Sequence, residues 1–318
     1  MKRREFLKAG TTAIIGAHVR EAKAADPVPI LDAHIHLFDP TRPEGVPWPE
    51  KTDSVLYKPA LPSRYHAVTK GFRVRGAIAI ECSPWESDND WLLKVAEQNP
   101  IIVGIIGDLI PDSQSFQKNL ERLSANPLFR GIRYGNLWNR NLSVDMNKPG
   151  FIGGLKVLAQ AKLVLESANP DGELISALVN VKDKVPDLTI VIDHLPNAVV
   201  STETAEREQY TRNLEKLGDG PSVFAKLSEI PARVNGKVQL DMGYFRHNLD
   251  TLWGILGENR VIFGSDWPNS DHLADYTETL GLVRQYIGTK SQEAREKYFW
   301  RNSVTAYQWR PRLANQQL

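Results

Sequence analysis

Residues 30–40 read ILDAHIHLFDP, an apolar run of β-forming residues that ends in two histidines separated by one residue. Side chains alternate between the two faces of a β-strand. We therefore expect His34 and His36 to share one face, with Ala33 and Ile35 on the other. Two imidazoles on one face can ligate a divalent metal, although His-x-His alone is a weak motif. Its meaning depends on which other polar side chains reach that face.

Seven further runs of similar character follow, and each ends at a polar residue: RGAIAIE (75–81), IIVGIIGD (101–108), RGIRY (130–134), KLVLES (162–167), LTIVIDH (188–194), SVFAKLS (222–228) and VIFGSD (261–266). Segments with apolar residues at helical spacing separate most of them. Apolar strands that alternate with helices indicate a parallel sheet covered on both faces. Eight such units, about 34 residues each, predict an α/β fold with a single (β/α)8 barrel of the TIM type, spanning residues 25–318.

Catalytic groups of this fold lie at the C-terminal ends of the strands. The polar residues at those ends are His34, His36, Glu81, Asp108, Arg133, Glu166, His194, Lys226, Ser228 and Asp266. We therefore expect them to converge on one mouth. Asp193 is expected to point away from His194 and to be structural. Residues 39–62 carry six prolines in 24 residues, and we expect Trp48 and Tyr57 in this segment to form a wall over the mouth.

The chain resembles the amidohydrolase-related family in its lactonase-like branch. The likeness is carried, in chain order between residues 29 and 309, by LDAHIHLFDP, RGIRYGNLW, IVIDHLPN, VFAKLSE, VIFGSDWPNS and FWRNSVTAYQW. That branch includes sugar-acid lactonases and 2-pyrone-4,6-dicarboxylate lactonase. The resemblance implies an amidohydrolase-like distorted barrel that hydrolyses a carboxylic ester, a lactone or an amide.

The resemblance also implies roles for individual residues. His34 and His36 match the strand-one histidines, and His194 matches the strand-six histidine. Asp266 matches the strand-eight aspartate that activates water in this family. By this analogy Asp266 and His194 are the catalytic pair, while His34, His36 and Asp266 would be the ligands of a metal ion.

Strands four and five depart from the pattern of many metal-dependent amidohydrolases. Those enzymes carry a carboxylated lysine and a histidine where this chain has Arg133 and Glu166. A two-metal site is therefore not expected. A single divalent ion, zinc or manganese, is expected. The alternative is a metal-free site in which the imidazoles hold the substrate's carbonyl oxygen.

Three residues are candidates for binding the substrate: Arg133, Glu166 and Glu81. Arg133 matches a position that can hold a substrate carboxylate, and its planar guanidinium suits a two-point grip. It could instead form an internal salt bridge with Glu166 or Glu81. Glu166 could also ligate a metal or accept a hydrogen bond from a hydroxyl group, and the sequence does not choose between these roles.

The leading hypothesis is an exported hydrolase that opens a lactone or related ester of a small, oxygen-rich acid, with water activated by Asp266. One alternative is a metal-dependent amide hydrolase or decarboxylase on the same barrel. Another, from a different class, is a non-catalytic periplasmic binding protein. The set of His34, His36, His194 and Asp266 favours an enzyme, because a binding protein needs no carboxylate to activate water.

Residues 1–24 indicate export. They contain Arg3-Arg4, a mildly apolar stretch and the small-residue pattern Ala22-Lys23-Ala24. This resembles a signal peptide for the twin-arginine export machinery, which predicts a periplasmic enzyme; the alternative is a basic amphipathic first helix. The formal net charge is +1, and no basic patch interleaved with aromatic residues predicts nucleic-acid binding. No stretch approaches the ~20 apolar residues of a membrane span, so the expected partner is a small-molecule substrate.

Overall fold

The structure is a computed structural model that describes residues 28–317, so the predicted signal peptide (1–24) lies outside the described residues. Its main sheet has eight parallel strands in the order β1-β2-β3-β4-β5-β6-β7-β10. Their bounds are β1 (Ile30–His36), β2 (Val74–Ile80), β3 (Ile102–Gly107), β4 (Phe129–Arg133), β5 (Val164–Ser167), β6 (Thr189–Ile192), β7 (Val223–Lys226) and β10 (Val261–Ile262). All eight fall within or overlap the runs expected from the sequence. The prediction of a (β/α)8 barrel is confirmed.

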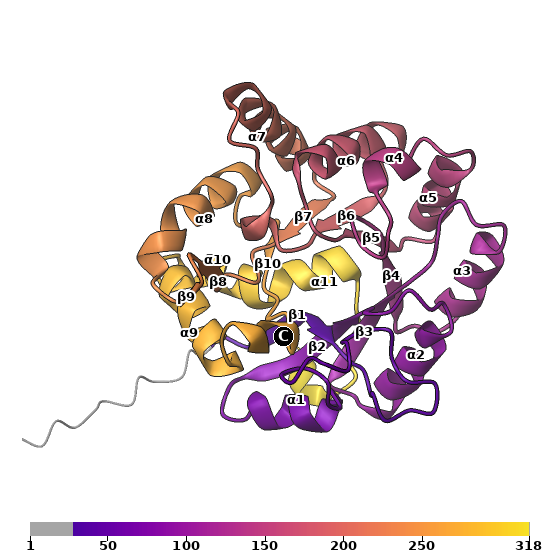
Figure 1. Cartoon of the computed structure of the whole chain (residues 1–318), viewed down its shortest axis with the longest axis horizontal. Coiled ribbons are helices and arrows are strands. Elements are labelled where there is room, and N and C mark those ends of the chain that lie inside the picture. The colour runs from indigo at the N-terminus through magenta and orange to yellow at the C-terminus, as the bar shows by residue number, and fades with distance from the viewer. Residues whose placement is uncertain (1–27, 318) are drawn as a thin grey trace, which may run out of the picture.

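Most of the helices surround the sheet as an outer ring, while α11 lies across it (Figure 1). They are α1 (Pro62–Val68), α2 (Asp88–Gln98), α3 (Phe116–Ser124), α4 (Leu142–Asp145), α5 (Phe151–Gln160), α6 (Gly172–Lys184), α7 (Thr204–Asp219), α8 (Met242–Leu256), α9 (Tyr276–Ile287), α10 (Gln292–Glu296) and α11 (Asn302–Tyr307). Short turns of other helix types are η1 (Leu195–Asn197), η2 (Asn269–His272), η3 (Lys297–Arg301) and η4 (Ala314–Gln316), and an antiparallel hairpin, β8 (Ala232–Val234) with β9 (Lys237–Gln239), follows β7. Within residues 28–317, no helix is long and apolar enough to cross a membrane.

The segment that follows β10 closes the barrel against β1. The backbone N–H of Ala33 donates to the carbonyl of Phe263 (3.0 Å), that of Asp266 to His34 (2.9 Å) and that of His36 to Trp267 (2.7 Å). The Asp32 carboxylate adds a second tie, because it accepts hydrogen bonds from the Ser265 backbone (2.8 Å) and from two tyrosine hydroxyls. Closure therefore brings Asp266 next to the histidines of β1.

The interior of the barrel is filled with apolar side chains and is closed at one end by the C-terminal segment. Leu31, Ile78, Val164 and Phe224 belong to one buried cluster with other inward-facing strand residues and with Trp300, Tyr307 and Trp309. Figure 1 shows α11 lying across the ring of strands. The guanidinium of Arg312, farther along, donates to the carbonyl of Ile102 at the start of β3 (2.8 Å). The C-terminal segment thus plugs the N-terminal end of the barrel and leaves the other end open as the mouth.

A bulge in β1 corrects one expectation about its faces. The pairing of β1 with β2 shifts register between Asp32 and Ile35. Ala33 consequently packs in the interior cluster, whereas Ile35 packs in the outer layer against the helices, so these two residues do not share a face. The bulged strand packs closely against Gly264 of the closing segment. A Cβ at position 264 would lie 2.6 Å from the Cβ of His34, so only glycine fits there. His34 and His36 still meet, as predicted.

Candidate active site

The two histidines of β1 and Asp266 form a tight group at the mouth. Nε2 of His34 lies 3.2 Å from Nε2 of His36, and Oδ1 of Asp266 lies 3.5 and 3.2 Å from these two atoms. Nδ1 of His36 is 3.1 Å from the carbonyl oxygen of Ile80, an arrangement in which Nδ1–H donates and the Nε2 lone pair faces Asp266. All three side chains are at least nine-tenths buried.

A pocket of about 210 Å³ opens above this group. Its walls are His36, Trp48, Cys82, Arg133, Leu137, Trp138, Asn169, His194, Glu229, Asp266 and Asn269. His194 stands opposite β1, with its Nε2 3.8 Å from Oδ1 of Asp266 and its Nδ1 2.9 Å from the hydroxyl of Ser228. The predicted catalytic residues Asp266 and His194 therefore face one cavity. Trp48 is the wall expected from the proline-rich segment, while Tyr57 does not line this pocket.

Many of the residues in the pocket wall have an unusual backbone. Trp138, Asn169, His194, Glu229 and Asp266 all adopt left-handed φ values, between 48° and 60°. L-residues other than glycine and asparagine rarely adopt this conformation, and such strained positions concentrate at functional sites. These residues follow β4, β5, β6, β7 and β10, one after each strand, so the strained backbone extends along that side of the mouth.

Asp193 takes a position that differs from the one expected. Its carboxylate accepts a hydrogen bond from Nε of Arg133 (2.9 Å) and pairs with the ammonium of Lys226 (3.0 Å) inside the barrel. It also lies 3.5 Å from Nδ1 of His34. Strict alternation would have turned it outward, but β6 ends at Ile192 and the left-handed turn at His194 brings both side chains inward. The prediction that Asp193 faces away from the site is wrong.

Lys226 is the centre of a set of charges beneath the pocket. Its ammonium donates to both carboxylate oxygens of Glu166 at 2.9 Å and lies 3.0 Å from Nδ1 of His34. Glu166 also accepts a hydrogen bond from the hydroxyl of Tyr307 (2.6 Å). We call Lys226, Glu166, Asp193 and Tyr307 the lower layer. We call His36, His194, Asp266 and Glu229, which line the pocket, the upper layer.

Glu166 has no exposed surface and does not line the pocket. Of the roles that the sequence left open, the structure favours an internal ion pair, with Lys226 rather than Arg133 as the partner. Arg133 does line the pocket, but it is also paired with Asp193 and lies 3.8 Å from the Glu81 carboxylate. The predicted internal ion pair is therefore present, with Asp193 as its main partner, while the grip on a substrate carboxylate stays a prediction.

Glu81 lies behind the pocket wall. Its Oε2 accepts hydrogen bonds from the indole of Trp138 (3.1 Å) and from the backbone of Ser83 (3.0 Å), while its Oε1 is buried without a hydrogen-bond partner in residues 28–317. Burial raises the pKa of Glu81 to about 7, Arg133 opposes this shift, and Asp108 adds to it. Glu81 thus supports Trp138, which is part of the pocket wall.

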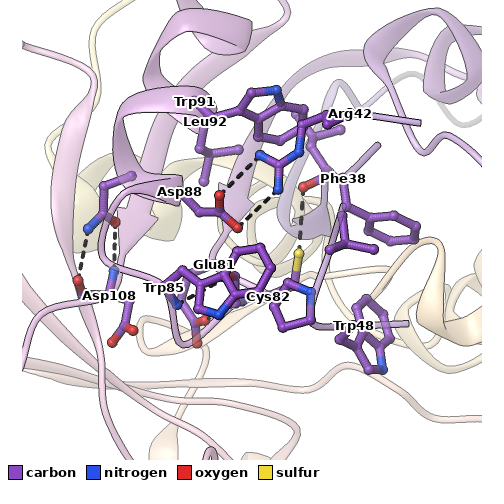
Figure 2. Close-up of a pocket in the computed structure, with 15 residues that line it drawn as sticks. Phe38, Arg42, Trp48, Glu81, Cys82, Trp85, Asp88, Trp91, Leu92 and Asp108 are labelled. Atoms are coloured by element: carbon purple, nitrogen blue, oxygen red, sulfur yellow. Dashed lines mark hydrogen bonds and ion pairs between the residues drawn. The ribbon is translucent and has the colours of Figure 1, made fainter. Parts of the chain in front are cut away.

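A smaller cavity of about 20 Å³ adjoins the pocket, and both are lined by Trp48 and Cys82 (Figure 2). The carboxylate of Asp88 receives a two-point hydrogen bond from Arg42, whose guanidinium stacks on Trp91. Asp108 also lines this cavity, where it pairs with Arg140. This volume has room for roughly one water molecule, so it is too small for a substrate.

Asp266 and Glu229 have opposite electrostatic environments. Burial alone would raise the pKa of Asp266, but His194, His36 and His34 outweigh it and hold that pKa below its ordinary value. Burial raises the pKa of Glu229; His194 opposes this shift and Asp266 adds to it. One carboxylate is thereby kept ionised, and the other is biased toward its protonated form.

The group of His34, His36 and Asp266 fits a single divalent ion. In tetrahedral zinc sites with bonds of 2.0–2.1 Å, two ligand atoms are about 3.3 Å apart. The three observed separations are 3.2, 3.2 and 3.5 Å. Oδ1 of Asp266 is buried and has no hydrogen-bond partner within the described residues, as expected for a metal ligand. The metal-free alternative has its own support, because the Lys226 ammonium at Nδ1 of His34 favours a proton on Nε2, which lies beside Nε2 of His36 and Oδ1 of Asp266.

A parallel barrel with histidines and an aspartate that line one pocket at the C-terminal ends of its strands has the architecture of a barrel enzyme. Residues 31–309 match the model of the amidohydrolase family, and the chain belongs to that family. It is 25% identical over 288 residues to an L-fucono-1,5-lactonase of Burkholderia ambifaria, covering 87% of this chain and 94% of that protein.

Solved structures show the same fold. An amidohydrolase from Burkholderia multivorans with bound zinc matches with a TM-score of 0.77 at 20% identity, over 89% of this chain and 100% of that one. A probable 2-pyrone-4,6-dicarboxylic acid hydrolase from Acinetobacter baumannii with bound citric acid matches with a TM-score of 0.69 at 18% identity, over 88% of this chain and 99% of that one. The likeness to lactonases expected from the sequence is confirmed.

Sequence reasoning missed three contributors to the site. Asp193 was assigned to the wrong face, and Glu229 follows the end of the predicted seventh strand by one residue. Tyr307 comes from α11, 141 residues after its partner Glu166. The motifs IVIDH and FAKLSE contained the signal for the first two, since each places a carboxylate beside a residue at a strand end. Local sequence held no signal that would pair Tyr307 with Glu166.

Proposed function

We propose that this protein hydrolyses a lactone or related ester of a small, oxygen-rich acid. The observation that carries the proposal is the convergence of His36, His194 and Asp266 on one pocket of monosaccharide size, next to Arg133, with His34 directly beneath them. The likeness to proteins described as L-fucono-1,5-lactonases supports a lactone of a sugar acid as the substrate.

In the proposed reaction, Asp266 accepts a proton from a water molecule, and the resulting hydroxide attacks the carbonyl carbon. The lowered pKa of Asp266 keeps it ionised and able to act as the base at neutral pH. Negative charge then develops on the carbonyl oxygen. His194 lies within reach of this oxygen and can stabilise the charge by donating a hydrogen bond.

His34, His36 and Asp266 are the residues that would hold a divalent ion such as zinc or manganese. When bound, such an ion supplies Lewis-acid stabilisation of negative charge on oxygen. Nδ1–H of His36 donates to the Ile80 carbonyl, and the acceptor nearest to Nδ1 of His34 is the Asp193 carboxylate at 3.5 Å, so each ring has an acceptor for its second nitrogen when Nε2 ligates the ion. Arg133 provides a positive charge at the wall for a carboxylate of the substrate or of the acid product.

A hydrolysis screen tests the proposal. It would compare L-fucono-1,5-lactone and other aldonolactones with 2-pyrone-4,6-dicarboxylate, simple amides and an aromatic carboxylic acid. Turnover of lactones supports the proposal. Cleavage of amides alone, release of carbon dioxide from the acid, or binding without turnover would each replace it with one of the alternative functions.

Metal analysis, combined with activity after exhaustive chelation, separates the two forms of the site. Loss of activity with chelation and recovery with zinc or manganese would support the metal-bound form. Full activity at far less than one metal ion per chain would show that the imidazoles hold the substrate's oxygen directly.

We further propose that the protein is exported in a folded state by the twin-arginine machinery, on the evidence of Arg3-Arg4 and the segment that follows. Changing both arginines to lysine should leave the full-length precursor in the cytoplasm. Detection of the processed variant in the periplasm would contradict this proposal.

A further inference from the structure

The Glu229 carboxylate lies in the pocket opposite the predicted base. It follows β7, and one of its carboxylate oxygens lies within 4.8 Å of a carboxylate oxygen of Asp266 and a ring nitrogen of His194. Oε2 of Glu229 is 3.8 Å from Nδ1 of His194, while Nε2 of the same ring is 3.8 Å from Asp266. The imidazole therefore stands between two carboxylates, only one of which has a role in the attack by water.

The structure holds Glu229 in place at an energetic cost. Its φ of 53° is in the left-handed region, where a non-glycine residue is strained. The side-chain amide of Asn197 donates to both the backbone carbonyl (2.6 Å) and Oε2 (3.2 Å) of Glu229. These contacts hold Oε2 and leave Oε1 available to a ligand.

Lactone opening also requires an acid. When the tetrahedral intermediate collapses, the ring oxygen leaves as an alkoxide, a strong base that departs much more easily if it is protonated. The charged groups that face Glu229 are His194, Asp266 and Arg133. Glu229 and Asp266 lie on either side of His194 in one pocket, so a separate acid and base are both within reach of a bound lactone.

We propose that Glu229 is the general acid that protonates the leaving ring oxygen, an inference that rests on the proposed lactone hydrolysis. As the bond between the carbonyl carbon and the ring oxygen breaks, its electron pair moves to that oxygen, which takes the proton of Glu229. The product is a hydroxyl group and a carboxylic acid. The acid returns a proton to Glu229 as it ionises, and Asp266 releases to solvent the proton it took from water.

The test compares two substrates whose leaving groups differ in their need for a proton. An aldonolactone releases a basic alkoxide, whereas a 4-nitrophenyl ester releases a stable phenolate that needs no proton. Glu229→Gln should lower kcat/KM for the aldonolactone by about 100-fold or more, since general acids typically contribute 10²–10⁴-fold. The loss for 4-nitrophenyl acetate should stay within about fivefold. Glu215→Gln, at an exposed position on α7, is the matched control and should behave like the wild type.

Asn197→Ala provides a second variant that leaves Glu229 in the chain. It should reproduce the same dependence on the leaving group in a weaker form, because Glu229 loses the amide that orients it. Equal losses on both substrates, or no loss on either, would overturn the assignment of Glu229. If the wild type hydrolyses neither substrate, the proposed function fails first, and the role of Glu229 falls with it.

Discussion

The lower and upper layers of the site differ in how completely their charges are paired. In the lower layer, Lys226 lies within 3.0 Å of both Glu166 and Asp193, and Asp193 also accepts a hydrogen bond from Arg133. In the upper layer, Oδ1 of Asp266 is close only to histidines, at 3.2–3.8 Å. Ion pairs with lysine and arginine fix the geometry of the lower layer. Asp266 is held by histidines and by the side-chain amide of Asn269, which donates to Oδ2 (2.7 Å), so its Oδ1 stays available to accept a proton. We therefore expect substitutions in the lower layer to reduce the stability of the fold, and substitutions in the upper layer to reduce catalytic turnover.

The largest effect is expected from Asp266→Asn in the upper layer. An amide cannot take the proton of water at neutral pH, so kcat for lactone hydrolysis should fall by about 10³–10⁴-fold. The thermal midpoint should change little, because the asparagine retains the size of the side chain. Asp219→Asn, at the exposed end of α7, is the control. Retention of a tenth or more of the wild-type kcat would show that another group activates the water.

In the lower layer, Lys226→Met should act on stability. Removing one partner from a buried ion pair leaves uncompensated charge, which costs roughly 3–5 kcal/mol. Urea denaturation would show this as a lower midpoint. Adding Glu166→Gln to the variant should recover part of the loss, because it removes the carboxylate that has lost its partner. A midpoint equal to that of the wild type would mean that the layers do not differ in this way.

Glu81, behind the wall, should give a pH signature. Its pKa in the folded protein is about 7, above its unfolded value of about 4.3, so the folded state binds this proton more tightly. Between these two pKa values, the free energy of unfolding should fall as pH rises, by roughly 3–4 kcal/mol in total. Glu81→Gln should abolish this component, as shown by subtracting its unfolding curves from those of the wild type between pH 4 and 8. A difference that is constant with pH would contradict the assignment.

Arg133 connects the two layers, and the smallest effect is expected there. Arg133→Lys keeps the charge but loses the planar fork, which should weaken binding of a carboxylate-bearing lactone by roughly 1–3 kcal/mol. The measurement is KM for 2-pyrone-4,6-dicarboxylate and for an uncharged aldonolactone, which serves as the control. An equal rise for both substrates would assign Arg133 a purely structural role through Asp193.

The positions of the strands could be predicted from the sequence because each apolar run ends at a polar residue, and the closed barrel then brings those ends together. Side-chain directions at the strand ends could not. The bulge at Asp32–Ile35 places Ala33 and Ile35 in different layers, and the left-handed turn at His194 brings Asp193 inward. Both departures depend on contacts between distant segments. The pairing of Glu166 with Tyr307 likewise requires the C-terminal plug, which no local pattern reveals.

The left-handed backbone at His194, Glu229 and Asp266 has a consequence for anyone who engineers this enzyme. Glycine or asparagine at each of these positions would lower the conformational energy of the backbone by about 1 kcal/mol or more. A directed-evolution campaign that rewards heat tolerance alone would therefore favour replacing these side chains, and it would produce robust barrels without activity. Variants in a library built on this scaffold should therefore be selected for the catalytic activity that remains after heating, rather than for the amount of folded protein that remains.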